Sequence, residues 1–185
     1  YGDRTMTSIL KVSEIQDPTN SNTALTIGSN GFIAPKVPTF QVTLSGNVTH
    51  SDATWTRVDF DVENWDNAGW YDNTTNYRFT PQQAGYYQFT LTLSQSDASN
   101  TQIRTIGSIS KNGSFGNGRV WDMDFTGSGI SGLTESKTQS GSMMYYANGT
   151  TDYFEAYSWN NVSAGSPVVV DSEYTVFSGF LVSAA

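Results

Sequence analysis

The side chains that could do chemistry are few in this 185-residue chain, and the first to consider is its single histidine, His50. A catalytic triad or a histidine-based zinc site therefore has at most one imidazole to use. The neighbours of this histidine, Thr49, Ser51 and Asp52, are all polar. Because such a polar segment is typical of an exposed loop, the sequence predicts a surface histidine and not a catalytic one.

Three carboxylates, Asp59, Asp61 and Glu63, alternate along the chain and therefore share one face of a strand. Paired carboxylates hydrolyse glycosides when they are held at the right separation, and carboxylates also bind calcium together with carbonyl oxygens. The alternative is a solvated face opposite Phe60 and Val62. We prefer the solvated face.

Asp122 and Asp124 flank Met123 in the same alternating way, and the same interpretation applies to them. No Asp-x-Asp-x-Asp-Gly loop of the calcium-binding type is present. We therefore assign no metal site and no cofactor from the sequence.

Four aromatic residues lie in segments rich in Asn, Asp and Gly: Trp65, Trp70, Tyr71 and Trp121. Flat rings beside amides and carboxylates suit sugar binding, because the C–H faces of a sugar stack on rings while its hydroxyls need donors and acceptors. The alternative is that the rings fill the core or an interface. We favour the alternative for Trp65 and Tyr71 and keep both interpretations open for Trp70 and Trp121.

Composition excludes several classes of partner. The net charge is −8 and the nine basic residues are scattered, which argues against a nucleic acid because phosphate binding needs clustered Lys and Arg. The chain has no cysteine and hence no disulfide. No apolar run approaches the ~20 residues of a membrane helix, so no membrane insertion is expected. The chain does not begin with Met, and we expect it to be a piece of a longer protein.

From Pro38 onward the chain has the pattern of consecutive strands. The clearest is Tyr87–Leu93, where apolar and polar residues alternate with period two. Asn112-Gly113 and Asn148-Gly149 are hairpin signals, and helical periodicity of useful length is absent. We predict an all-β domain over 38–185, preceded by a short N-terminal neck or linker over 1–37.

The last strand is apolar on both faces. Phe177 and Leu181 share one face with Gly179, and the other face carries Val176, Phe180 and Val182 with Ser178. A strand with one face in water would not show this pattern. The second face must therefore be covered, either by another element of the chain or by another subunit.

A spaced set of residues resembles the signature of the C1q/TNF-like family of trimeric jelly-roll domains. Two features depart from that signature: Tyr71 and Phe79 are one residue too far apart, and Leu91 stands where an aromatic is expected. The resemblance covers roughly residues 38 to 183. The matching residues are Phe60, Asp66, Tyr71, Phe79, Gly85-Tyr86-Tyr87-Gln88-Phe89 and the terminal Tyr174-Thr175-Val176-Phe177-Ser178-Gly179-Phe180-Leu181.

The resemblance implies a jelly-roll sandwich of about ten strands that assembles as a homotrimer. It places Trp70 and Trp121 outside the positions that the signature needs, which makes them the first candidates for binding a ligand. The residues that it assigns to core or trimer packing are Phe60, Phe79, Tyr87, Phe89, Tyr174, Phe177, Gly179 and Phe180.

The function implied is that of a non-enzymatic tip domain on a bacteriophage fibre or similar spike, located on the virion surface or extracellular. Residues 1–37 resemble the segments that precede such tips, and they lack the Gly-X-Y repeat of a collagen stalk. The expected partners are an upstream fibre shaft and a host-surface glycan or protein receptor. The alternatives are a secreted C1q-like adhesion or signalling module, or a glycan-cleaving enzyme that uses the Asp59, Asp61 and Glu63 face.

Overall fold

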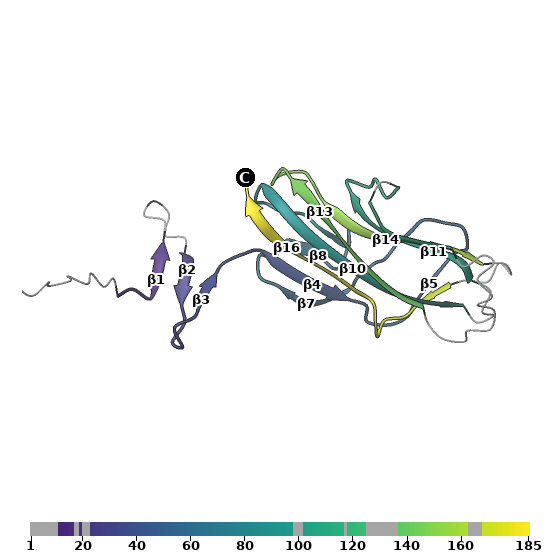
Figure 1. Cartoon of the computed structure of the whole chain (residues 1–185), viewed down its shortest axis with the longest axis horizontal. Helices are drawn as coiled ribbons and strands as arrows, with labels where there is room; N and C mark the ends of the chain where they lie inside the picture. The colour runs from purple at the N-terminus through teal and green to yellow at the C-terminus, as the bar shows by residue number, and fades with distance from the viewer. Residues whose placement is uncertain are drawn as a thin grey trace, which may run out of the picture. The chain divides into compact units, whose positions relative to one another are not determined.

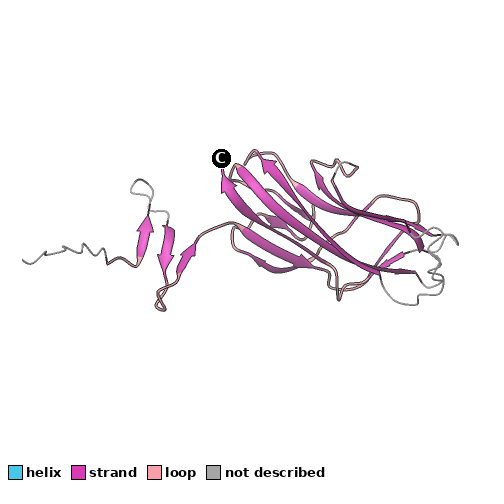
Figure 2. Ribbon diagram, in the orientation of Figure 1, coloured by secondary structure: helices cyan, strands magenta, loops and turns pink. Residues whose placement is uncertain are grey.

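The computed structural model describes residues 11–16, 19, 23–97, 102–116, 118–124, 137–162 and 168–185. The chain forms two compact units, Tyr1–Val37 and Pro38–Ala185. Every regular element in the described residues is a β-strand (Figure 2). Within this part of the chain no helix has the length and apolar character needed to cross a membrane.

The N-terminal unit is a small antiparallel sheet of β1 (Glu14–Gln16), β2 (Thr23–Ile27) and β3 (Ile33–Pro35). Asn30-Gly31 lies in the turn that joins β2 to β3, and Gly31 takes a positive φ of 80° there. None of the described side chains in this unit is buried. A sheet of three short strands without a buried face is marginally stable alone, so this unit needs further contacts to be stable.

The second unit, Pro38–Ala185, is a sandwich of two antiparallel sheets (Figure 1). The first sheet has the order β5-β15-β10-β16-β4-β7, with β13 also paired to β10; the second has the order β12-β11-β14-β9-β8, with β6 also paired to β14. The strands are β4 (Thr39–Thr43), β5 (Val48–His50), β6 (Thr56–Arg57), β7 (Val62–Asp66), β8 (Tyr71–Asp72), β9 (Arg78–Phe79), β10 (Gly85–Asp97), β11 (Gln102–Lys111), β12 (Arg119–Asp124), β13 (Lys137–Ala147), β14 (Phe154–Val162), β15 (Val168–Val170) and β16 (Val176–Ala184).

The core between the sheets is aromatic. Phe40 stacks on Phe79 with ring centroids 4.3 Å apart, and Phe89 lies 4.4 Å from Phe154. Burial of each such ring stabilises the fold by roughly 1.5–3 kcal/mol. The predicted alternation of β10 is confirmed, because all of its apolar inward positions are fully buried. The predicted packing residues that are buried in this core are Phe60, Phe79, Tyr87, Phe89 and Phe177.

Asp66, the acidic residue of the signature, holds a tight turn. Its two carboxylate oxygens accept hydrogen bonds from the backbone N–H groups of Ala68, Gly69, Trp70 and Tyr71 at 2.5–3.0 Å. A carboxylate satisfies several backbone donors at once where no strand partner exists. Tyr71, the last of these four residues, enters the core directly after the turn. This explains why the signature couples an acidic residue to an aromatic one.

Candidate functional site: an uncharged sheet face

The outer face of the first sheet is free of charge over four adjacent strands, β4, β16, β10 and β13. The strand register sets its side chains in rows that cross the sheet. None of the outward positions described on these four strands carries Asp, Glu, Lys or Arg. The rows are Thr39–Phe180–Gln88–Met144, Gln41–Ser178–Thr90–Ser142 and Thr43–Val176–Thr92–Ser140, followed at the end of the sheet by Tyr86 opposite Tyr146.

One end of this uncharged face is apolar. Tyr86, Met144, Tyr146, Phe180 and Val182 are each between 43% and 51% exposed. The rings of Tyr86 and Tyr146 meet edge to face, with centroids 5.5 Å apart. Large apolar side chains that cluster in the open on one surface usually mark a contact site.

The other end of the uncharged face carries hydroxyls. The hydroxyl of Thr92 donates to that of Ser140 at 2.9 Å, and Thr90 lies opposite Ser142 in the next row. These groups can exchange hydrogen bonds with a partner or hold bridging water. The face as a whole therefore has an apolar part and a neutral polar part.

A face without charge is unusual on a protein whose net charge is −8. Depletion of charged residues, with enrichment of Tyr and Met, is the compositional mark of the core of a protein–protein interface. Of the two faces of the last strand that were expected to be covered, only the face with Phe177 and Gly179 is buried in the single chain. The face with Phe180 and Val182 is exposed, which leaves another subunit as the element that would cover it. The geometry supports docking of a neutral protein surface.

The predicted packing residues at the chain end occupy three different places. Gly179 is buried, and Phe180 lies at the apolar end of the uncharged face. Tyr174 is 53% exposed in the turn before β16 and does not belong to the core. The sequence predicted core or trimer packing for Tyr174. Because the residue is exposed, only contact with another subunit remains as its packing role.

The four aromatic ligand candidates are not equally accessible. Tyr71 is only 7% exposed and packs in the core. Trp70 and Trp121 are partly buried against the core, and the ring of Trp121 covers Gly107. Trp65, 48% exposed, offers the most open ring, and its Nε1 donates to the hydroxyl of Thr39 at 2.9 Å. Glycan binding by these rings stays a prediction.

The alternating carboxylates are exposed and held by separate partners. Asp59 accepts a 2.5 Å hydrogen bond from Arg57, and Asp61 accepts one of 2.7 Å from the backbone of Ser45. Burial opposes the charged form of Asp61, but its hydrogen bonds with Ser45 outweigh burial and lower the pKa of this carboxyl. In the described residues no three His, Asp or Glu side chains are grouped so that they could hold a metal ion.

The prediction that His50 lies at the surface is wrong. Its side chain is only 5% exposed, and its Nδ1 lies 2.5 Å from the hydroxyl of Ser158. Burial lowers the pKa of His50, with the charge of Asp59 acting in the opposite direction. The polar neighbours were misleading because Val48–His50 forms a short edge strand, β5, and alternation turns every second residue inward.

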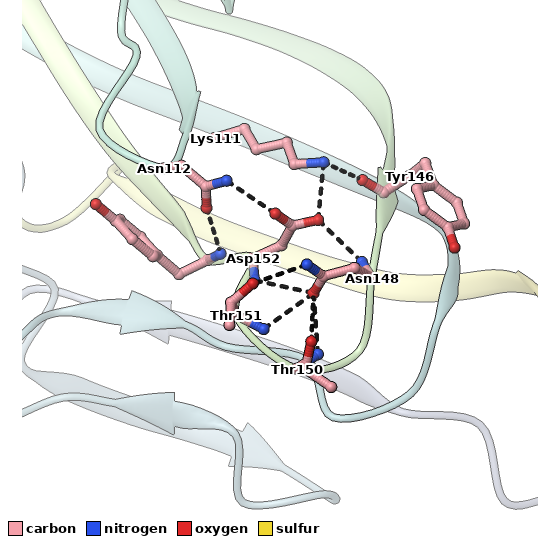
Figure 3. Close-up of polar contacts among 8 residues, drawn as sticks. Lys111, Asn112, Tyr146, Asn148, Thr150, Thr151 and Asp152 are labelled. Atoms are coloured by element: carbon pink, nitrogen blue, oxygen red, sulfur yellow. Dashed lines mark hydrogen bonds and ion pairs between the residues drawn. The ribbon is translucent and has the colours of Figure 1, made fainter.

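A polar cluster around the buried Asp152, which the sequence analysis missed, ties two turns together (Figure 3). Lys111 Nζ donates to Asp152 at 2.9 Å and to the carbonyl of Tyr146 at 2.7 Å. Asn112 Nδ2 donates to the other oxygen of Asp152 at 2.8 Å, and the backbone N–H of Asn148 also donates to this carboxylate. Two hairpin ends are thereby joined: the β11–β12 turn and the β13–β14 turn. The only signal in the sequence was the pair of Asn-Gly turns.

Replacing Asp152 with asparagine is expected to destabilise the fold by about 1–3 kcal/mol at neutral pH, the usual contribution of hydrogen bonds to a charged group. Burial opposes ionisation, but the bonds from Asn112, Lys111 and Asn148 outweigh it and lower the pKa of Asp152. Its stabilisation is therefore present above the unfolded carboxyl pKa of about 3.9 and is lost as the pH falls through the folded value.

Urea unfolding of the parent and Asp152→Asn across pH 2–7 measures this difference. The difference in unfolding free energy between the two proteins should be constant near neutral pH and should disappear in acid. Glu63→Gln is the control, because Glu63 is exposed and its change should stay within about 0.5 kcal/mol. If the difference in unfolding free energy persists at the lowest pH, the charge of Asp152 is not its cause.

Comparison with known proteins gives a fold but no sequence relative. No family model and no curated protein matches the chain. Crystal structures of murine APRIL match at pH 8.0 (TM-score 0.54) and pH 8.5 (TM-score 0.53), each with 7% identity over 80% of this chain and 100% of theirs. Eiger TNF from S. frugiperda matches with 15% identity over 80% of this chain and 93% of that chain, at a TM-score of 0.46. The all-β, TNF-like jelly-roll fold predicted from the sequence is confirmed.

Proposed function

We propose that this protein is a homotrimeric, non-enzymatic binding module that assembles through its uncharged face. The observation that carries this proposal is the absence of charge across the described outward positions of β4, β16, β10 and β13. Charged side chains keep a protein soluble because water solvates them well. A face without charge therefore adds nothing to the solubility of this protein, whose net charge is −8. Contact with a second copy removes its exposed aromatic and aliphatic side chains from water at roughly 25 cal/mol per Å².

Three-fold symmetry is favoured over other arrangements by the C1q/TNF-like signature, whose spacing is kept from Phe60 to Asp66 and from Phe79 to Phe89. Closed symmetry also covers the same patch on every copy and leaves no free face for further growth. The small N-terminal sheet agrees with this proposal, because it has no buried side chain among its described residues and would be stabilised by its equivalents in other chains.

The role proposed for the trimer is that of a tip domain of a virion fibre or spike, on the virion surface or otherwise extracellular. The N-terminal unit provides a connection that contains the short strands β1, β2 and β3, and the sequence of residues 1–37 contains no collagen repeat. This connection suits attachment to an upstream fibre shaft. The acidic surface suits a neutral glycan or a protein receptor on the host better than a polyanion.

Light scattering or native mass spectrometry at micromolar concentration tests the assembly, and we expect a mass of three chains. A protein that stays monomeric at that concentration would contradict the trimer. Attachment is tested separately by adding the fluorescently labelled protein to a panel of bacterial strains. Binding to none of them would leave a trimeric cap without a receptor role, and a signal peptide in the upstream sequence would favour a secreted module.

A further inference from the structure

A cleft opens at the edge of the sandwich, where β5 of the first sheet faces β6 of the second. Its volume is about 230 Å³, and it is lined by Val48, Thr49, His50, Thr56, Arg57 and Asp59. This volume is below that of pockets for drug-sized ligands, which begin near 300 Å³. The cleft therefore has the size for one small ring or a short side chain. It does not lie on the uncharged face.

One wall of the cleft is an arginine held rigidly in place. Arg57 donates to Asp59 at 2.5 Å and to Glu155 at 3.4 Å, and its guanidinium lies 5.3 Å from the centre of the Tyr77 ring. Glu155 is only 5% exposed. A buried charge of this kind contributes little net stability. Groups held in fixed positions around a cleft are instead what a binding site requires.

Two of the three described non-glycine residues with a positive φ adjoin residues of the cleft lining, and the third, Asn112, lies in the β11–β12 turn. Ala53 and Tyr77 both take a φ of +50°, which is costly for residues other than glycine. Ala53 belongs to the loop that joins the two lining strands, and Tyr77 supports Arg57. Strain of this kind persists where the surrounding structure imposes it, and it is concentrated at ligand sites.

The floor of the cleft is neutral and polar. His50 contacts the fully buried Ser158, and the next inward residue on β14, Asn160, accepts a hydrogen bond from Gln102 at 3.0 Å. The Nδ2 of Asn160 is buried and has no hydrogen-bond partner among the described residues. A row of amide and hydroxyl groups thus continues inward from the cleft in place of the aromatic core.

The charges decide which ligand the cleft suits. One guanidinium stands between two carboxylates, Asp59 and Glu155, so an anion meets no free positive charge. The lining provides donors and acceptors together, from the hydroxyl of Thr56, the carboxylate of Asp59 and the N–H groups of Arg57. Sugar hydroxyls both donate and accept, and the methyl groups of Val48 can contact the sugar C–H groups. We propose that this cleft binds a single unit of a neutral saccharide.

This inference extends the proposed attachment role by naming a ligand class and a place, and it does not depend on trimer assembly. It also differs from binding on Trp65, Trp70 or Trp121. The chain has one histidine, and that histidine forms the cleft floor. Its Cε1–H proton resonance therefore reports on this cleft alone in an NMR titration.

The test is a titration of the full chain with glucose, galactose, mannose and N-acetylglucosamine, with N-acetylneuraminic acid as an anionic probe. We expect at least one neutral sugar to shift the His50 resonance in a saturable way. Asp59→Ala and Thr56→Val should each raise the dissociation constant for that sugar by at least about tenfold. Glu63→Gln should bind as the parent does. The trimer mass and melting temperature of each variant show that it is folded.

Three results would overturn the proposal. One is that no neutral sugar moves the His50 resonance up to roughly 50 mM, weaker than any useful affinity per site. Another is that a sugar binds without moving this resonance, or binds Asp59→Ala and Thr56→Val unchanged. The last is a preference for the anionic sugar. Failure of trimerisation is read separately from the mass, so it cannot be confused with failure of the cleft to bind.

Discussion

Replacing Phe180 with aspartate is expected to turn the proposed trimer into folded monomers. Phe180 is 47% exposed in the single chain, so a charge there is solvated while the chain is alone and the sandwich should still fold. In the trimer the same charge would be buried on a neutral face, at a cost of several kcal/mol unless it is paired. About 3 kcal/mol already corresponds to a roughly hundredfold weaker association.

Sedimentation or light scattering at a series of concentrations measures the change in mass, and circular dichroism checks the fold. Met123→Asp is the matched control, because Met123 is 42% exposed and lies on β12 of the other sheet. It should stay trimeric. If Phe180→Asp keeps a mass of three chains, the uncharged face is not the subunit contact. If the variant fails to fold, the same test is made with Val182→Asp, because Val182 lies on the same face two residues further along β16.

Replacing Gly179 with valine is expected to destabilise the sandwich by about 3 kcal/mol, the upper part of the range for overpacking a core. A Cβ atom at this position would lie 2.5 Å from a ring carbon of Phe89 and 2.9 Å from one of Phe40. Both rings are fully buried and packed against other aromatic rings, so neither can move without displacing its neighbours. The cost arises from crowding and not from the backbone conformation.

Urea unfolding of Gly179→Val and Gly46→Val separates these causes. Gly46 lies in an exposed bend where a Cβ would meet no atom within 4 Å, so its substitution should stay within about 0.5 kcal/mol of the parent. A Gly179→Val protein that unfolds within about 1 kcal/mol of the parent would show that Phe89 and Phe40 can make room. It would also remove the reason for a glycine in this strand.

The local pattern of the sequence was sufficient to predict the buried face of β10. Phe89 and Leu91 alternate with polar residues, and alternation in a strand determines which side chains share a face without reference to any other part of the chain. The spacing from Asp66 to Tyr71 works in the same way, because the turn that it encodes is closed by bonds within five residues. Such features depend on near neighbours and can be predicted from the sequence.

Contacts between distant residues could not be predicted from the sequence. Arg57 and Glu155 are 98 residues apart, and His50 and Ser158 are 108 apart. The polar segment around His50 indicated a surface loop, and only the pairing of β5 with β15 turned its side chain inward. The sequence left Trp121 open as a ligand-binding residue. In the structure β12 pairs with β11, and the ring of Trp121 lies over Gly107.

The sequence by itself indicated an all-β domain whose last strand is apolar on both faces, because both properties follow from the order of residues along single strands. The jelly roll was implied by the resemblance to the C1q/TNF-like signature. Only the tertiary structure decided that β4, β10, β13 and β16 lie side by side and that their outward residues form one face without charge. The physical reason is that alternation acts within a strand, whereas a surface is made by neighbours across strands. Those neighbours come from segments far apart in the chain.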